Sequence, residues 1–409
     1  MTDTGEKTAL YTVHEDLGAS FTNFGGWLMP LKYGSELTEH RAVRQEAGIF
    51  DLSHMGEVRI RGNRAAEFMD FALVTKYSAM SVGKAKYGVI VTETGHIMDD
   101  VISYRLAEDE YLIVPNAANA PTVAEALRVR AADFAEVEVI DETDSTALIA
   151  VQGPESARIV TQAAGGAAGV AASSDSAGAA EQVIAELRYY AWAGLDIAGH
   201  RIICARTGYT GEDGFELYVR LGDSAAANEE PVTGTGDSAT ANPAVEVWNH
   251  LLASASELGV DLHPCGLAAR DSLRLEAAMP LYGQELTVDT TPVDAGMGKM
   301  VTNALKNKGT FFAREALETI AGTAPHRVLT GLISGERRAA RPGATITDGA
   351  GTEIGVVTSG QPSPTLGYPI ALASVDKDAR EPGTVVHVDI RGKTYDYTVV
   401  ELPFYTRQK

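Results

Sequence analysis

The pattern of apolar and polar positions changes near residue 327. Beyond that point, short β-prone runs recur at regular spacing and are separated by turn-forming residues. The runs are LTGLISG, ATITD, IGVVTSG, IALASVD, TVVHVDI and TYDYTVVEL. This pattern predicts a small all-β barrel or sandwich over residues 327–409. We expect the boundary with the preceding region, residues 1–308, in the stretch around residues 309–326.

Before that boundary, helical and strand-like periods alternate, which predicts a mixed fold. Residues 35–47 have the pattern of a capped helix, with Gly48 just past its end. Residues 244–258 carry apolar side chains at helical spacing. A further helix over residues 265–279 is expected to stop at Pro280, which cannot continue it.

Residues 86–106 predict a β-hairpin, because two β-rich runs flank a Thr-Gly turn. Asp99 and Asp100 open the second strand. Side chains alternate along a strand, so we expect the two acids on opposite faces, one toward solvent and the other toward a pocket. From these residues alone, we favour two surface acids at a turn.

Residues 206–219 combine a glycine-rich loop with the start of a strand. Alternation places Phe215, Leu217 and Val219 on one face and Glu216 and Tyr218 on the other. The plain interpretation is a tight loop before a half-exposed strand. The alternative is a loop whose backbone approaches a planar ligand while Glu216 bonds its edge.

Two segments near 163–183 and 222–243 resemble insertions, since they are rich in small and polar residues. Such sequences bury little apolar surface, which predicts loops, notably over residues 165–180. The second segment contains Gly-Thr-Gly-Asp-Ser-Ala, which has the form of a dinucleotide-binding pattern. No apolar strand precedes it and no apolar-periodic helix follows directly, so we reject that match.

Length and charge narrow the class of protein. The 409 residues exceed one ordinary core, so two or three domains are expected. The net charge of −21 argues against nucleic-acid binding and against adhesion to an anionic membrane. Two distant cysteines, a polar N-terminus and the lack of a long apolar stretch indicate a cytoplasmic protein with free thiols.

Few residues indicate a particular chemistry without further evidence. The scattered histidines and the two cysteines give no metal-binding spacing, so no metal is expected. Asp51, Ser53 and His54 are neighbours in sequence, but residues of one short segment rarely form a catalytic triad. Arg270 falls in the first turn of its helix, where the helix dipole disfavours a cation. It therefore indicates an anionic ligand, an internal acid or a structural salt bridge.

Several segments, taken together, resemble the glycine cleavage T-protein family. They occur in the family's order at residues 24–33, 50–58, 95–104, 114–119, 145–154, 206–217, 265–286 and 358–373. The resemblance implies an α+β fold of three domains in a cloverleaf-like arrangement. Two mixed α/β domains would surround a folate cavity, and a jelly-roll-like β-barrel would follow.

The resemblance also implies an aminomethyltransferase reaction. The enzyme would take the aminomethyl group carried on the lipoyl arm of the H-protein and transfer its methylene to tetrahydrofolate. Ammonia, 5,10-methylenetetrahydrofolate and the dihydrolipoyl arm would be the products. The implied partners are the lipoylated H-protein and tetrahydrofolate, met by a monomer in transient complexes, with no metal, nucleic acid or membrane.

Individual roles carry over by matched motif. Asp100 matches the family's key aspartate, expected near the folate nitrogen, where a carboxylate can orient the nucleophile and stabilise a cationic intermediate. Glu216 matches the acid that pairs with the pterin ring. The other residues expected to line the folate site are Tyr87, Asn116, Tyr189, Tyr209, Arg270, Met55, Tyr282 and Tyr405. A core role for Met55 and Tyr282 stays open.

Two alternatives within the same superfamily remain. One is a folate-dependent demethylase that acts on a small methylated compound without a protein-borne arm. The other is a folate-binding factor for iron–sulfur assembly, which carries a cysteine motif. Residues 276–286 read EAAMPLYGQEL and lack that cysteine, which argues against the second alternative.

Overall fold

The computed structural model describes residues 4–165, 174–222 and 242–407. The chain divides into two compact units, each described below by itself. Unit 1 comprises Met1–Glu57, Asp141–Gly208 and Glu212–Ala268. Unit 2 comprises Val58–Ile140, Tyr209–Gly211 and Ala269–Lys409.

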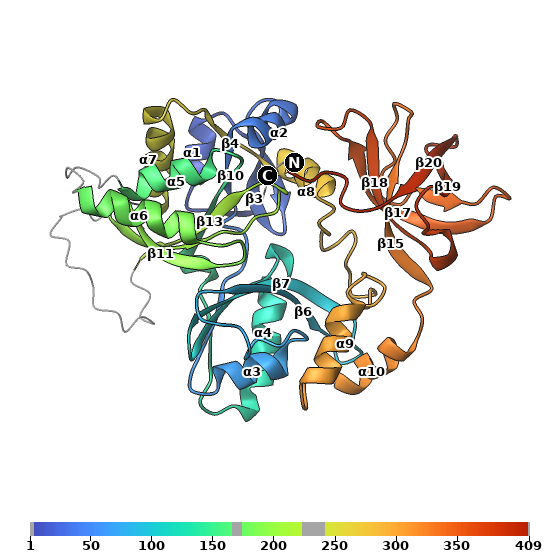
Figure 1. Cartoon of the computed structure of the whole chain (residues 1–409), viewed down its shortest axis with the longest axis horizontal. Coiled ribbons are helices and arrows are strands. Elements are labelled where there is room, and N and C mark those ends of the chain that lie inside the picture. Colours follow the sequence, from blue (N-terminus) through green and yellow to red (C-terminus); the bar gives the residue numbers. More distant parts are fainter. Residues whose placement is uncertain (1–3, 166–173, 223–241, 408–409) are drawn as a thin grey trace. The chain divides into compact units, whose positions relative to one another are not determined.

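Unit 1 is built on a six-stranded mixed sheet with the strand order β11-β12-β13-β10-β4-β14 (Figure 1). Its strands are β4 (Ala47–Asp51), β10 (Thr146–Gln152), β11 (Trp192–Ile197), β12 (His200–Ala205), β13 (Gly214–Arg220) and β14 (Leu262–Pro264). The helices are α1 (Tyr11–Asp16), α2 (Glu36–Gln45), α5 (Ser156–Gly165), α6 (Ser174–Glu186) and α7 (Pro243–Glu257). A small sheet joins β1 (Glu6–Lys7), β3 (Trp27–Lys32) and β2 (Ser20–Phe24). Apolar side chains of β10, β13, α5 and α7 form its main core.

Unit 2 contains a five-stranded sheet with the order β6-β7-β8-β5-β9. Its elements are β5 (Val58–Arg61), α3 (Ala65–Ala72), β6 (Ala85–Val91), β7 (Ile97–Ala107), β8 (Glu110–Val114), α4 (Ala120–Arg130), β9 (Glu138–Asp141), α9 (Gly298–Asn307) and α10 (Arg314–Gly322). Ile90 packs with α3 and α4, whereas Val89 and Val91 pack with α9 and α10. The sheet is therefore covered on both faces.

The rest of unit 2 is a closed six-stranded barrel with the order β15-β18-β17-β16-β19-β20, orange to red in Figure 1. Its strands are β15 (Arg327–Ile333), β16 (Thr345–Thr347), β17 (Glu353–Pro362), β18 (Pro369–Asp376), β19 (Val385–Asp389) and β20 (Thr394–Val400). Alternate residues such as Leu332, Val357 and Tyr397 fill its interior. All six predicted β runs are strands of this barrel, so the mixed fold with a C-terminal barrel is confirmed.

The predicted helices and hairpin form, but two of the expected helix ends are wrong. Helix α2 begins after its N-cap Ser35 and ends at Gln45, and Gly48 belongs to strand β4. A side chain there would place its β-carbon 2.5 Å from Val43 Cγ2. Packing, not a helix cap, requires this glycine. Helix α8 (Leu267–Glu276) stops before Met279, because Ala278 adopts a left-handed backbone with φ 56°.

The predicted insertions fall largely outside the described residues, at 166–173 and 223–241. The expected loop over residues 165–180 is wrong at its end, since α6 begins at Ser174. Alanine, frequent in this stretch, has the highest helix propensity, and composition alone underrated it. The proposed division into 1–308 and 327–409 stays a prediction.

Candidate functional site

The two adjacent acids of β7 lie on opposite faces of the five-stranded sheet. Residues paired across an antiparallel ladder share a face, and Asp99 is paired with Ile90 while Asp100 is paired with Val89. Asp99 therefore faces α3 and α4, and Asp100 faces the side of α9 and α10. A β-bulge shifts the register between Ile90 and Val91. The bulge decides which acid faces which side.

Asp100 is a partly buried carboxylate held by two side-chain donors. The Tyr87 hydroxyl donates to its Oδ2 at 3.1 Å, and Asn116 Nδ2 donates to its Oδ1 at 2.8 Å. Burial raises the pKa of Asp100 to about 6, while Tyr87, Asn116 and the positive charge of Arg270 act in the opposite direction. At neutral pH the group is mostly ionised and close to its titration point.

Asp99 is fully buried, so the favoured interpretation of two surface acids at a turn is wrong. Its carboxylate accepts from the Asn116 backbone N–H, from Asn116 Nδ2 and from Asn119 Nδ2, each at 2.8 Å. Burial, and next the charge of Asp100, raise the pKa of Asp99 to about 7 against these hydrogen bonds. The acid occupies the entry to α4, where N–H groups favour an anion.

Arg270 and Tyr209 form a second pair close to Asp100. The Arg270 guanidinium lies over the Tyr209 ring, 4.5 Å from its centroid. The Tyr209 hydroxyl donates to the Pro280 carbonyl at 2.5 Å. The positive charge of Arg270 lowers the pKa of Asp100, so an internal acid lies within its electrostatic reach. The role of Arg270 as a ligand-binding residue stays a prediction.

Two further predicted residues of unit 2 lie beside this group. The Tyr282 hydroxyl donates to the Ile97 carbonyl at 3.3 Å. The pKa of Tyr282 is raised by burial and then by the charges of Asp99 and Asp100. Tyr405 donates its backbone N–H to the Glu276 carbonyl at 2.9 Å. Unit 2 thus brings most of the predicted residues together around Asp100.

The remaining predicted residues belong to unit 1. Glu216, on β13, accepts a hydrogen bond from the Thr207 hydroxyl at 2.5 Å. Tyr189 is 46% exposed and its ring meets that of Tyr190 edge-on at 4.8 Å. Burial, the neighbouring Tyr189 and the charge of Glu216 raise the pKa of Tyr190. Met55 is partly buried, with its backbone N–H bonded to the Leu52 carbonyl.

Close packing against Gln152 explains why glycine is required at Gly208 and Gly214. A β-carbon on Gly208 would lie 2.0 Å from Gln152 Oε1, and one on Gly214 would lie 2.2 Å from Gln152 Nε2. The buried Gln152 side chain is therefore clasped between them, and it donates to the Thr207 carbonyl at 3.1 Å. On β13, Phe215 is fully buried while Glu216 is partly exposed, as the predicted alternation requires.

Sequence reasoning missed two members of the carboxylate group, Asp99 and Asn119. Asn119 stands three residues after Asn116, so both side chains can turn toward one point at the start of a helix. That spacing, next to a paired acid, was the available signal. The meaning of this spacing becomes clear only from the structure, where β8 pairs with β7 and brings residues 116–119 close to the two acids.

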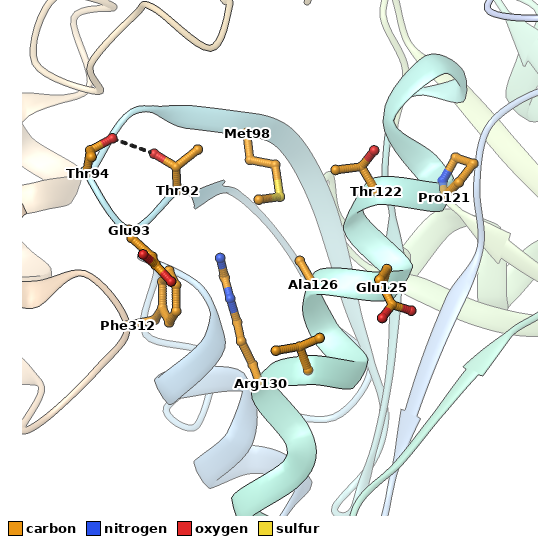
Figure 2. A pocket seen from close by; sticks show the side chains of 11 residues that line it. Thr92, Glu93, Thr94, Met98, Pro121, Thr122, Glu125, Ala126, Arg130 and Phe312 are labelled. Atoms are coloured by element: carbon orange, nitrogen blue, oxygen red, sulfur yellow. Dashed lines mark hydrogen bonds between the residues drawn. The ribbon is translucent and has the colours of Figure 1, made fainter.

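A separate groove of about 780 Å³ in unit 2 contains none of the predicted site residues (Figure 2). Its lining includes the turn Thr92–Thr94 and the outer side of α4. Arg130 stands over the Phe312 ring, 3.6 Å from its centroid, and donates to the Ala72 and Val91 carbonyls at 2.6 Å each. The guanidinium thus ties the walls of the groove together.

The described residues contain neither a metal-binding cluster nor a helix that could span a membrane. In residues 4–165, 174–222 and 242–407, no three His, Cys, Asp or Glu side chains are grouped so that they could hold a metal ion. None of the helices described in the structure combines the length and the apolar character needed to cross a bilayer.

Comparison with known proteins gives consistent matches along the chain. The family description "GCVT N-terminal domain" matches residues 10–233 and 238–304, and "Glycine cleavage T-protein C-terminal barrel domain" matches residues 327–406. An aminomethyltransferase of Corynebacterium jeikeium is 50% identical over 410 residues and 99% of both chains. One of Bacillus subtilis is 36% identical, over 98% of this chain and 99% of the relative.

A solved structure agrees with these relatives. The aminomethyltransferase T of the glycine cleavage system from Bartonella henselae has a TM-score of 0.81 and 34% identity, with 98% of each chain covered. Relatives of this similarity do not favour the demethylase or the iron–sulfur alternative. The chain belongs to the glycine cleavage T-protein family of aminomethyltransferases.

Proposed function

We propose that Asp100 is the carboxylate that assists methylene transfer in this chain, a tetrahydrofolate-dependent aminomethyltransferase of the glycine cleavage system. The observation that carries the proposal is a partly buried carboxylate, fixed by Tyr87 and Asn116, whose pKa of about 6 lies just below neutral pH. The donor of the one-carbon unit is the aminomethylated lipoyl arm of the H-protein, and the acceptor is tetrahydrofolate.

The chemistry explains why a carboxylate is needed. The attacking folate nitrogen must lose a proton, the departing amine must gain one, and a cationic intermediate forms between these events. An anion within hydrogen-bond reach stabilises that cation and orients the nucleophile. A pKa of about 6 leaves Asp100 ionised at pH 7.5, yet near enough to its titration point to exchange protons.

The surroundings of Asp100 offer groups that suit a folate. Asn116 spends both Nδ2 hydrogens on the two acids, which leaves its carbonyl oxygen as an acceptor for a ligand N–H. Tyr87, Tyr209 and Tyr282 add aromatic surface, and Arg270 adds a cation. For Glu216, Tyr189 and Met55 of unit 1, a role in folate binding is carried over from the family resemblance alone. Tyr405 is assigned to the same lining.

The direct test is the formation of ammonia and methylenetetrahydrofolate from aminomethylated H-protein. Asp100→Asn is expected to lower kcat by about 100-fold or more, the range for losing general acid–base assistance. The folate dissociation constant should stay within about threefold, because the carboxamide preserves size and polarity. Asp109 is an exposed acid in the turn between β7 and β8, so Asp109→Asn is the control and should be silent.

Either part of the proposal can fail separately. Full activity of Asp100→Asn would remove the catalytic role. A wild-type chain that binds folate tightly but does not release ammonia from aminomethylated H-protein would return the demethylase to consideration. Turnover of free methylated amines would then decide.

The H-protein is proposed to dock near Lys84 and Lys86. Both side chains are exposed, and Lys86 precedes Tyr87, which bonds Asp100. Lys86 Nζ donates to the Lys76 carbonyl at 3.2 Å, and Lys76 Nζ donates to the Asn307 carbonyl at 3.0 Å, so several cations gather here. In a chain of net charge −21, such a local basic surface suits an acidic partner.

Charge reversal tests this docking surface. Lys84→Glu with Lys86→Glu should raise the KM for H-protein by about tenfold at low salt, with the KM for folate unchanged. Lys377→Glu with Lys393→Glu makes the same change in charge at exposed positions of the barrel and is the control. If the KM for H-protein rose equally in both double variants, the effect would be one of net charge, and the proposal of a specific docking surface would be refuted. A monomeric state and a cytoplasmic location stay predictions.

A further inference from the structure

Asp99 and Asp100 lie on opposite faces of one sheet, yet a single carboxamide joins them. Strand β8 pairs with β7 as far as Val114, opposite Ile102. Asn116 then continues beside Asp100, and its Nδ2 donates to the Asp100 backbone carbonyl at 3.1 Å. The side chain thus replaces the backbone donor that β8 no longer provides, and it stands at the strand edge where both faces can be reached.

The hydrogen bonds fix the orientation of that carboxamide. Asn116 Nδ2 donates to Asp99 Oδ1 and to Asp100 Oδ1, both at 2.8 Å. The reversed orientation would place the amide oxygen against two carboxylates. The amide nitrogen carries two hydrogens for three acceptors. One is directed at Asp99, and the other is shared by the carboxylate and the backbone carbonyl of Asp100. Asp99 also accepts the Asn116 backbone N–H, so it holds this residue at two points.

We propose that Asp99 is a positioning residue for the transfer reaction: it fixes Asn116 so that the carboxamide holds Asp100 in its reactive orientation. This inference rests on the proposed role of Asp100. Asp99 is fully buried on the α3 and α4 side of the sheet and acts through Asn116, not by contact with substrate. Asn119 donates a hydrogen bond to Asp99 but not to Asp100, and it thereby helps to fix the position of Asp99.

Titratable side chains of several neighbouring segments interact with Asp99 and Asp100. Tyr87 of β6 donates to Asp100, and Arg270 of α8 faces it with a positive charge. Tyr209 and Tyr282 feel the charge of Asp100, and Tyr282 feels that of Asp99 as well. Asp99 has the higher pKa, so it is mostly neutral over the range in which Asp100 ionises, and Asp99→Asn changes little charge there. Its effect on Asp100 comes through Asn116, because a weaker hydrogen bond from Asn116 raises the pKa of Asp100.

The test is the pH profile of kcat for wild type and Asp99→Asn, measured with aminomethylated H-protein. At pH 8, kcat should fall by about tenfold, because Asn116 is held less well and Asp100 loses its reactive orientation. The acidic limb should move to higher pH by about half a unit, because a weaker hydrogen bond from Asn116 raises the pKa of Asp100. Folate affinity should change less than twofold, since Asp99 is buried on the face of the sheet opposite Asp100.

A double-mutant cycle with Asn116→Ala separates positioning from a general loss of structure. If Asp99 acts through Asn116, Asp99→Asn costs much less kcat in the Asn116→Ala background than in wild type. The matched control is Asp70→Asn. Asp70 likewise accepts three hydrogen bonds, from Tyr77 N, Ser78 N and Ser78 Oγ. It should lower thermal stability without moving the acidic limb.

Two further measurements keep the inference testable. Asn119→Ala removes one donor from Asp99 only, and should reproduce the shift of the acidic limb in smaller form, with kcat reduced about twofold. The ¹³C resonance of the Asp100 carboxyl, identified with Asp100→Asn, should titrate at higher pH in Asp99→Asn, independently of turnover. Additive kcat losses with an unmoved limb would overturn the inference. An inactive wild type would instead refute the proposed function.

Discussion

At the residue scale, the behaviour of Asp100 is set by opposing contributions of comparable size. Burial raises the pKa of its carboxyl, whereas the Tyr87 hydroxyl, Asn116 and Arg270 lower it, and the result is about 6. Each donor stabilises the ionised form. The effect of deleting one donor therefore has a definite sign.

Tyr87→Phe removes the 3.1 Å hydrogen bond to Asp100 Oδ2 and keeps the ring. Because the hydroxyl favours the anion, its loss raises the pKa of Asp100, and the acidic limb of kcat should move to higher pH. For a shift of about half a unit, we expect kcat to be about 1.5-fold lower near pH 6.5, about threefold lower near pH 5, and almost unchanged above pH 8. The measurement is kcat against pH.

Tyr368→Phe, at an exposed position in the barrel, makes the same deletion elsewhere and should leave the profile in place. A Tyr87→Phe variant whose kcat falls equally at all pH values would mean that the hydroxyl acts on substrate instead of on the Asp100 carboxyl.

The sequence could predict Asp100, Tyr87 and Asn116 through resemblance, and alternation placed the two acids on opposite faces correctly. It could not predict that Asp99 is buried. That outcome depends on a bulge in β7 and on donors that enter α4 after β8, both of which are features of strand pairing. A tertiary environment of this kind has no local sequence pattern.

At the element scale, strands were easier to predict than helix ends. The barrel strands and the hairpin β6–β7 have local signals, namely period two and turn residues, and both form as expected. Gly48 and Pro280 are real helix-ending signals in other contexts. Here α2 ends at Gln45 before the first, and α8 ends at Glu276 before the second. The close packing around Gly48 and the left-handed backbone of Ala278 cannot be predicted from local sequence signals for helix ends.

The glycine-rich loop before β13 gives a prediction about packing. Gly208→Ala would force a β-carbon against Gln152, which is nearly fully buried and is clasped from the other side by Gly214. We expect a loss of about 1–3 kcal/mol in unfolding free energy, as for overpacking. In a Gln152→Ala background the added methyl has room, so the further loss should be much smaller.

Gly178→Ala is the control, since a β-carbon there meets no atom within 4 Å and α6 favours alanine. Denaturant unfolding and folate binding should be measured on the same proteins. If Gly208→Ala with Gln152→Ala is stable but loses folate, the glycine serves the approach of a ligand, and the packing explanation is insufficient.

At the scale of the whole molecule, several ionised groups oppose folding at neutral pH. The net charge of −21 produces self-repulsion, which salt screens. Buried acids act in addition and are screened little. Asp99 and Asp100 have raised pKa values, and the pKa of Glu57 is raised well above its usual range by burial and by Asp141 and Glu142.

These raised values fix how stability depends on pH. A carboxyl whose pKa is higher in the folded state binds a proton more tightly there, so folding becomes less favourable as pH rises through the interval between the two values. For Asp99 the interval runs from about 4 to about 7. Stability should therefore increase between pH 8 and pH 6, and Asp99 alone contributes on the order of 1–2 kcal/mol in that range.

Thermal melts of wild type and Asp99→Asn at pH 6 and pH 8, each at low and high salt, separate the two sources. Salt should reduce the part due to exposed charge, since that part is screened over about 10 Å at 0.1 M. The part due to Asp99 should persist at high salt in wild type and vanish in Asp99→Asn, because the carboxamide does not titrate. Equal pH dependence in both proteins at high salt would show that Asp99 is ionised as easily in the folded chain as in the unfolded one. The hydrogen bonds from Asn116 and Asn119 would then stabilise the anion as much as its burial destabilises it.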